Sequence, residues 1–176
     1  GDVYKRQVPI IVSAPHSSVH ERMDKPKRQE FYTGAISVLL HSLTDCHTLY
    51  TNRVMKSDPN YYDDSSYKTK LAEVVQENEI KFLIDLHGTG PERDYDCYPG
   101  TGVDNEFLLD NIDYLNELET CAELNQVSLG GLDVFPAAKQ MTVTKYTARV
   151  LGVPAIQLEI NRSLREPEKN QKDFIK

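Results

Sequence analysis

The sequence predicts a single α/β domain built on a mostly parallel β-sheet that helices cover on both faces. Short apolar segments rich in β-branched residues alternate along the chain with segments of helical periodicity. A chain of 176 residues with 39% hydrophobic content can also bury one sizeable core rather than two. Strand–helix–strand units that repeat in this way bring their strands into parallel alignment.

The first half of the chain contains two predicted strands with a helix between them. Val8–Ala14 is a β-branched run that ends at Pro15, which is typical of a strand buried on both faces. Thr33-Gly34 opens a predicted helix over Ala35–Leu43, whose apolar residues suit packing against a sheet. His47–Thr51 predicts the second strand.

The next unit has the same form. Ser66 can cap a helix that extends to about Glu77, because apolar residues recur there at the spacing of one helical face: Tyr67, Leu71, Val74 and Val75. Ile80–Ile84 follows as the third strand.

The last part of the chain begins with the irregular stretch Gly88–Gly102. A second helical face follows, made of Leu108, Ile112, Leu115 and Ala122. A turn at Gly130-Gly131 leads to a predicted helix over Thr142–Gly152, with Pro154 as a further stop signal, and to a final strand over Ala155–Ile160.

Composition excludes several classes of partner. The chain has 27 acidic and 20 basic residues, a net charge of −7, and no basic stripe of the kind that binds nucleic acid. Its longest apolar stretches are far shorter than the roughly 20 residues of a membrane span. The three cysteines, Cys46, Cys97 and Cys121, lack the spacing of a disulfide framework or a thiolate zinc site. We therefore expect a reducing compartment and a cytoplasmic location.

Both ends of the chain call for separate treatment. The stretch Gly1–Gln7 resembles the translation of a sequencing-library adapter, so the folded domain is expected to begin at Val8 and to extend over residues 8–176. The charged segment Glu166–Lys176 stops without a helix cap or a glycine, which predicts that the domain is truncated at its C-terminus.

Polar clusters lie at or just beyond the ends of four predicted strands. They are Pro15–Ser18, Asn52-Arg53, Asp85–Gly88 and Glu159–Arg162. The carboxyl ends of parallel strands meet at one edge of the sheet, so these clusters are expected to converge. His16 and His87, together with a carboxylate, form the ligand set of a catalytic zinc, which keeps one position open for water. Asp85 is placed to orient His87, and one zinc ion is expected.

Glu159 lies inside an apolar strand, where a carboxylate is costly unless it is paired or used. One interpretation is a general base with a raised pKa; the other is a salt bridge to Arg162 or Arg53. Arg53 and Arg162 could bind a substrate carboxylate or stabilise an oxyanion. Arg93, in the loop after His87, could also reach a substrate carboxylate. Surface ion pairing is expected of two further residues, Arg149 and Arg165.

Four motifs in this order resemble the N-formylglutamate amidohydrolase family, which is related in fold to the zinc carboxypeptidases. They are Ser13–Ser17, Asn52-Arg53 with Asp58–Tyr61, Ile84–Gly88 and Leu158–Arg162. The motifs extend from about Val8 to Arg165, and the resemblance implies a zinc-exopeptidase or phosphorylase/hydrolase-like fold.

The resemblance also implies roles for individual residues. His16 and His87 would be zinc ligands, Asn52 and Arg53 would bind substrate and oxyanion, and Glu159 would be the base. A carboxypeptidase-type site has its glutamate three residues after the first histidine, but that position is Val19. Three residues remain as candidates for the third ligand: Glu30, which resembles the acidic position before the first helix in these relatives, then Glu21 and His20.

These expectations combine into one favoured function and two alternatives. The favoured function is zinc-dependent hydrolysis of the amide bond in a small N-acyl amino acid of the N-formyl type, with Glu159 activating the metal's water. The first alternative keeps the fold and makes the substrate a peptide, as in a metallocarboxypeptidase or a murein-type amidase. The second is a non-catalytic metal- or ligand-binding module.

Overall fold

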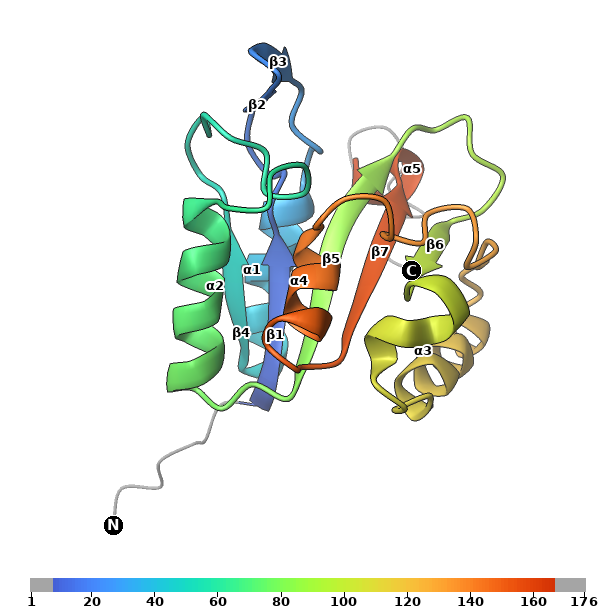
Figure 1. The fold of residues 1–176 in the computed structure, drawn as a ribbon. Coiled ribbons are helices and arrows are strands. Elements are labelled where there is room, and N and C mark those ends of the chain that lie inside the picture. Colours follow the sequence, from blue (N-terminus) through green and yellow to red (C-terminus); the bar gives the residue numbers. More distant parts are fainter. Residues whose placement is uncertain (1–7, 167–176) are drawn as a thin grey trace.

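A five-stranded sheet forms the centre of the molecule. The computed structural model describes residues 8–166, so the predicted adapter segment and residues 167–176 lie outside the described part. The strand order is β4 (Cys46–Tyr50), β1 (Val8–Ala14), β5 (Phe82–Thr89), β7 (Ala155–Asn161) and β6 (Cys97–Gly100) (Figure 1). The first four strands run parallel, and β6 pairs antiparallel with β7. The predicted mostly parallel α/β sheet is therefore confirmed.

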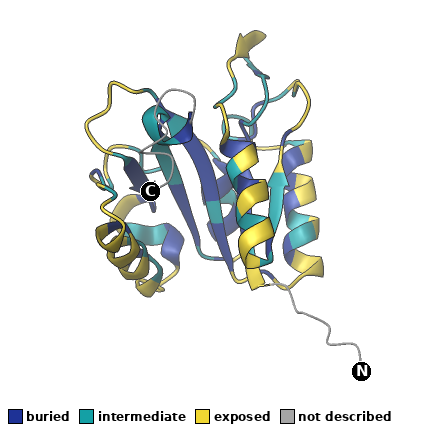
Figure 2. Ribbon diagram, turned by 180° about the vertical axis from the view of Figure 1, so that it is seen from behind, coloured by how far each residue is buried: buried dark blue, intermediate teal, exposed yellow. Residues whose placement is uncertain are grey.

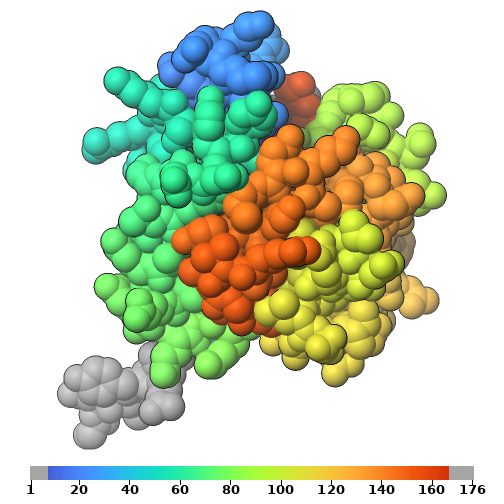
Figure 3. All heavy atoms as spheres, in the orientation of Figure 1, coloured from blue at the N-terminus to red at the C-terminus, as the bar shows by residue number. Residues whose placement is uncertain are grey.

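Helices cover both faces of the sheet. Helix α1 (Thr33–Thr44) lies on one face, in front of the strands in Figure 2. Helices α2 (Ser66–Glu77) and α4 (Val143–Arg149) lie on the other face, where α4 separates α2 from the 3-10 helix η1 (Val103–Leu108) on the surface seen in Figure 3. Helix α3 (Asp113–Leu124) packs beside the sheet, and the short α5 (Arg162–Arg165) follows β7.

The alternation of side chains along β1 divides the core between these two faces. Ile11 packs with α2 and α4 through Leu71 and Val143, whereas Val12 packs in the cluster on the α1 side with Leu86. Each of these side chains is nearly or fully buried. A strand covered on both faces must be apolar at consecutive positions, which explains the uninterrupted run in β1.

Some boundaries differ from those that the sequence predicts. Ser65, not Ser66, caps α2, because its side chain accepts a hydrogen bond from Lys68 N. Strand β5 continues five residues past the predicted end, from Ile84 to Thr89, so His87 lies within the strand. The helix expected around Leu108 is interrupted, because Leu109 and Asp110 have φ angles of 48° and 66°, outside the helical region.

A hairpin and an edge strand are not predicted from the sequence. A short hairpin of β2 (His20–Arg22) and β3 (Lys25–Lys27) projects above the carboxyl end of β1 (Figure 1). Strand β6 lies inside the stretch that was expected to be irregular. Within residues 8–166, every helix is too short or too polar to span a bilayer.

Candidate metal centre

Three predicted ligands meet at the carboxyl edge of the sheet. His16 follows the end of β1, and His87 is the sixth residue of the neighbouring strand β5. Glu30 comes from the loop before α1, and its backbone N–H donates to the carbonyl of His16 at 2.9 Å. This backbone bond holds the loop against the end of β1, so a residue 14 positions away along the chain reaches the histidines.

The carboxylate of Glu30 lies between the two imidazoles. Its Oε1 is 3.0 Å from His16 Nδ1, and its Oε2 is 3.1 Å from His87 Nδ1. The backbone N–H of Gly88 also donates to Oε2 at 3.1 Å. One donor atom from each of the three side chains lies within 4.8 Å of the others. Both histidines are buried, and the Glu30 side chain remains 22% exposed toward solvent.

Buried aspartates face the outer nitrogen of each histidine. Asp58 Oδ1 is 2.8 Å from His16 Nε2, and Asp85 Oδ2 is 3.0 Å from His87 Nε2. Both aspartates are fully buried. An Nε2–H that donates to a carboxylate leaves the Nδ1 lone pair free for a metal, and such carboxylates fix the orientation of the ring. The sequence predicted this position for Asp85 but gave Asp58 no role.

Asn60 connects this cluster to the start of α4. Its Oδ1 accepts a hydrogen bond from Val143 N at 2.8 Å, at the start of α4, and its Nδ2 lies 3.0 Å from His87 Nε2. Since the amide nitrogen is itself a donor, a protonated Nε2 on His87 donates to Asp85 and not to Asn60. Asn60 belongs to the motif Asp58–Tyr61, which was the only sequence signal for it.

Burial and the charges of neighbouring groups have opposite effects on the pKa values of the cluster. Burial lowers the pKa of His16, but the carboxylates of Glu30 and Asp58 outweigh this effect and hold that pKa at about 9. Burial also lowers the pKa of His87, yet Asp85 and Glu30 raise it well above its ordinary value. Burial would raise the pKa of Glu30, but the two imidazoles hold it well below its usual range. Glu30 is therefore ionised, as a metal ligand must be.

The donor set of His16, Glu30 and His87 fits a zinc ion. Two imidazole nitrogens and one carboxylate are a known catalytic zinc set, which leaves a fourth position for water or substrate. Ligand atoms about 2 Å from a tetrahedral zinc lie roughly 3.3 Å from one another. Each Nδ1 lies at a similar separation, 3.0 or 3.1 Å, from one of the two Glu30 oxygens, and one donor atom of each side chain lies within 4.8 Å of the others.

The other two candidates for the third ligand lie elsewhere. His20 stacks on His16 with ring centroids 4.2 Å apart, and its Nδ1 is 3.3 Å from the carbonyl of Ser18. His20, His16 and Asp58 form a second group with metal-ligand spacing, but Arg22 already neutralises Asp58 there through an ion pair at 2.5 Å. Glu21 lies on the hairpin and belongs to neither group among the described residues.

Glu159 lies beside the cluster on the next strand. It pairs in register with His87 across β5 and β7 and lines the same pocket as the three candidate ligands. Burial raises the pKa of Glu159 to about 7. Gln157 Nε2 donates to its Oε1 at 3.3 Å, and neither Arg53 nor Arg162 forms an ion pair with it among the described residues. Such a carboxylate can both accept and return a proton near neutral pH.

The pocket above the cluster has a volume of about 440 Å³. Its lining includes His16, Glu30, His87 and Glu159, together with residues of the segment 134–140 that leads to α4. The pocket also contains two cationic side chains, Arg22 and Lys139. Most of the lining residues are polar or charged, and the apolar ones all belong to the segment of residues 134–138.

The arginines predicted to bind substrate lie outside this pocket lining. Asn52 and Arg53 are exposed after β4 and do not line the pocket, although Asn60 of the same connecting segment does. Arg162 donates to Glu166 Oε1 at 2.5 Å across one helical turn. Arg93 lies nearer, with its guanidinium 4.9 Å from the centroid of Phe135, whose side chain lines the pocket. Arg22, which sequence reasoning did not single out, is the arginine that lines the pocket.

Arg165 is not the surface ion pair expected from the sequence. It is 3% exposed and donates from Nε to the carbonyl of Ile160 and from Nη2 to that of Thr89, at 2.9 and 3.0 Å. Its Nη1 also donates to the carbonyl of Phe31, next to Glu30. Arg165 therefore ties the Glu30 loop to the ends of β5 and β7. Arg149, in contrast, pairs with Glu106 on the surface, as expected.

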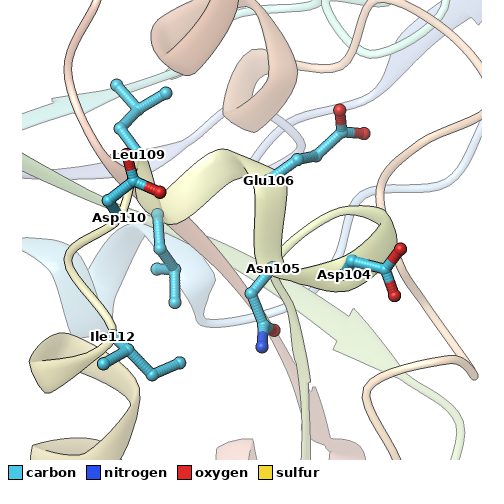
Figure 4. A pocket seen from close by; sticks show the side chains of 7 residues that line it. Asp104, Asn105, Glu106, Leu109, Asp110 and Ile112 are labelled. Atoms are coloured by element: carbon cyan, nitrogen blue, oxygen red, sulfur yellow. The ribbon is translucent and has the colours of Figure 1, made fainter.

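A second cavity of about 550 Å³ lies at η1, on another part of the surface (Figure 4). Its lining is acidic and aliphatic: Asp104, Asn105, Glu106, Leu108, Leu109, Asp110 and Ile112. It contains none of the residues predicted from the sequence to bind metal or substrate or to act as the base. The chemistry-bearing side chains therefore belong to the pocket at the sheet edge.

Comparison with known proteins supports the fold. No protein-family model matches the sequence, and no curated protein matches it. Among solved structures, the chain is similar to a bacteriophage poly-gamma-glutamate hydrolase, with a TM-score of 0.52, 17% identity, and coverage of 92% of this chain and 69% of that one. At this identity the likeness shows a shared fold.

Two solved amidases give weaker matches, each with a TM-score of 0.45 and 13% identity. One is the CwlD amidase from Clostridioides difficile in complex with the GerS lipoprotein, which covers 94% of this chain and 86% of that one. The other is the N-acetylmuramoyl-L-alanine amidase AmiC2 of Nostoc punctiforme, which covers 96% of this chain and 93% of that one.

Proposed function

We propose that this protein is a zinc-dependent amidohydrolase that cleaves the amide bond of a small N-acyl amino acid, of the N-formyl type that the motif resemblance implies. One observation carries the proposal. Donor atoms of His16, Glu30 and His87 converge within 4.8 Å of one another in the lining of a pocket that Glu159 also lines. Two histidines, a carboxylate ligand and a nearby carboxylate base are the parts that metal-assisted amide hydrolysis needs.

The residues have distinct tasks in this proposal. His16, Glu30 and His87 hold the ion, and a zinc ion bound there supplies Lewis acidity toward a carbonyl and lowers the pKa of water. Asp58 and Asp85 keep the two imidazoles turned so that Nδ1 faces the ion. Glu159 accepts a proton from the attacking water and returns it to the leaving nitrogen, because its pKa of about 7 allows both transfers.

A second candidate substrate is a γ-glutamyl amide within a polymer. The specific support is the structural likeness to a poly-gamma-glutamate hydrolase, which shares the fold at 17% identity. This candidate uses the same metal centre and the same base. It differs only in what the pocket must accommodate beyond the scissile amide.

Zinc content and activity together test the proposal. Wild-type protein, His16→Ala, Glu30→Ala and His87→Ala are purified, checked for folding by circular dichroism, and analysed for bound zinc by mass spectrometry. His47→Ala is the matched control, because His47 lies on β4 outside both groups with metal-ligand spacing. We expect about one zinc per chain in wild type and in the control. We expect little zinc in the other three variants.

The zinc-loaded wild type is then assayed with N-formyl-L-glutamate and with short γ-glutamyl oligomers. Hydrolysis of N-formyl-L-glutamate supports the small N-acyl amino acid as the substrate class. Hydrolysis of the oligomers alone supports the γ-glutamyl polymer as the substrate. A folded wild type that binds no zinc would overturn the proposal.

A further inference from the structure

Arg22 brings a cationic group into the pocket from an element that the sequence analysis did not predict. It is the last residue of β2 and pairs in register with Lys25 of β3. The other lysine or arginine in the pocket lining is Lys139, in the segment of residues 134–140. Arg22 is the more fixed of the two in its contacts, which makes it the stronger candidate for recognising a charged group.

The guanidinium of Arg22 is held in place on two sides. Its Nε donates to Asp58 Oδ2 at 2.7 Å, and its Nη2 lies 2.5 Å from the same oxygen. The guanidinium carbon also lies 5.1 Å from the centroid of the Tyr61 ring. Asp58 is fully buried, whereas the Arg22 side chain is 31% exposed. An arginine fixed in this way loses little conformational entropy when it binds a ligand.

Arg22 keeps donors available for such a ligand. A guanidinium has five N–H groups, and within residues 8–166 the hydrogen bonds and ion pairs of Arg22 reach only Asp58, through Nε and Nη2. The Nη1 edge remains, on a side chain that lines the pocket. Planar, paired N–H donors match the two oxygens of a carboxylate.

The position of Arg22 decides which part of a substrate it can meet. Asp58 bridges Arg22 to Nε2 of His16, whereas Nδ1 of His16 faces Glu30 and the candidate metal position. Arg22 and the metal position therefore lie on opposite edges of the His16 ring. A donor there meets a substituent of the substrate and not the carbonyl oxygen under attack.

We propose that Arg22 binds a free carboxylate on the substrate, so that the pocket selects amides of acidic compounds. The inference rests on the proposed amidohydrolase function and names its substrate class. The competing explanation is that Arg22 only neutralises the buried Asp58. The two explanations differ in one respect: carboxylate recognition predicts a preference among ligands, and charge neutralisation does not.

The test is equilibrium binding of two small probes, glutaramate and glutaramide, which differ by one carboxylate. Their affinities are measured by calorimetry for zinc-loaded wild type, Arg22→Gln, Arg22→Lys and Lys25→Gln. Lys25→Gln removes a charge from the same hairpin at an exposed position outside the pocket lining. Zinc content and thermal unfolding show whether each variant is folded and loaded.

We expect wild type and Lys25→Gln to bind glutaramate about tenfold or more tightly than glutaramide. In Arg22→Gln this preference should fall to less than about threefold. Arg22→Lys keeps the charge but lacks the paired N–H donors of the guanidinium, so its preference should be intermediate. Zinc-free wild type should keep the preference, which separates a carboxylate on Arg22 from one on the metal. If Arg22→Gln does not fold, the comparison of Arg22→Lys with wild type decides the outcome.

Equal affinity of wild type for the two probes would overturn the inference. A preference that survives intact in a folded, zinc-loaded Arg22→Gln or Arg22→Lys would also overturn it. Binding of the two probes is measured without turnover. Failure of the amidase assay therefore counts against the proposed function, while the binding data still test the role of Arg22.

Discussion

The guanidinium of Arg165 occupies the space that a side chain at residue 88 would fill. A Cβ built on Gly88 would lie 2.7 Å from Nη1 of Arg165 and closer still to its Cζ. Gly88 also donates its N–H to Glu30, and Arg165 donates to the carbonyl of Phe31. The glycine after His87 therefore makes room for the arginine that holds the Glu30 loop.

This relationship predicts a coupled pair of substitutions. Gly88→Ala should destabilise the fold by about 1–3 kcal/mol through overpacking. Arg165→Ala should also destabilise it, because three backbone carbonyls lose their charged donor. The double variant should be more stable than the sum of the two effects predicts, with a coupling of about 0.5–3 kcal/mol. Urea unfolding of the four proteins measures this coupling, and strict additivity would contradict the steric relationship.

A second prediction concerns the aspartate behind His87. Asp85→Asn keeps the size of the side chain but removes the charge that stabilises a ring with Nε2 protonated and Nδ1 free. We expect zinc affinity to fall by about 10–100-fold while the fold remains. Asp64→Asn, at an exposed position, is the matched control. Competition with a chelator measures the affinities, and equal values for the two variants would remove Asp85 from the centre.

The raised pKa of Glu159 predicts how activity depends on pH. Burial holds the pKa at about 7, so the carboxyl is protonated below that pH and cannot accept a proton from water. We expect kcat/KM to rise with pH up to about 7 and then to level off. Glu159→Gln should bind zinc as wild type does and lose about 10²–10⁴-fold in kcat. A variant that keeps both its zinc and its rate would exclude Glu159 as the base.

Lys68 predicts a different pH effect, on stability. It is 2% exposed, donates to the carbonyls of Tyr62, Asp63 and Met141, and has a pKa lowered by burial to about 8. Between this value and the ordinary pKa of 10.5, the unfolded chain binds more protons than the folded chain. The contribution of Lys68 to stability should therefore increase as pH rises from about 8 to 10.5.

Lys68→Met isolates this effect from the titration of other groups. The difference in unfolding free energy between wild type and Lys68→Met should grow in favour of wild type over that pH range. Guanidinium chloride unfolding at several pH values measures it. A difference that is constant with pH would mean that the lysine keeps its ordinary pKa.

The final prediction compares two arginines in the amidase assay. Arg53 stands at the position that the family resemblance assigns to substrate and oxyanion binding, but it is exposed and outside the pocket lining. Arg22 lines the pocket. We expect Arg22→Gln to lower kcat/KM for an acidic substrate by about tenfold or more relative to Arg53→Gln. A larger loss in Arg53→Gln would return the role to the family position.

The sequence alone determined the parallel sheet and the residues at its carboxyl edge. The continuous apolar run in Val8–Ala14 indicates a strand that is buried on both faces. The helical spacing of apolar residues in Ser66–Glu77 indicates a helix that is buried on one face. Both are local patterns that the sequence shows directly. The carboxyl ends of parallel strands share an edge, so the sequence pattern by itself predicts that His16, His87 and Glu159 lie together. Of the three candidates for the third ligand, Glu30 was the preferred one, and the structure brings it to both histidines.

Which arginines line the pocket and which stabilise the fold depends on the tertiary structure alone. Arg22, Arg53 and Arg165 cannot be distinguished by composition or local spacing. Arg22 reaches the pocket because a three-residue strand forms a hairpin over Asp58, and Arg165 is buried because Gly88 leaves a space for it. Both outcomes depend on partners tens of residues away in the chain. A long, flexible, charged side chain carries no periodic signal of its own, so only the packed structure fixes its partner.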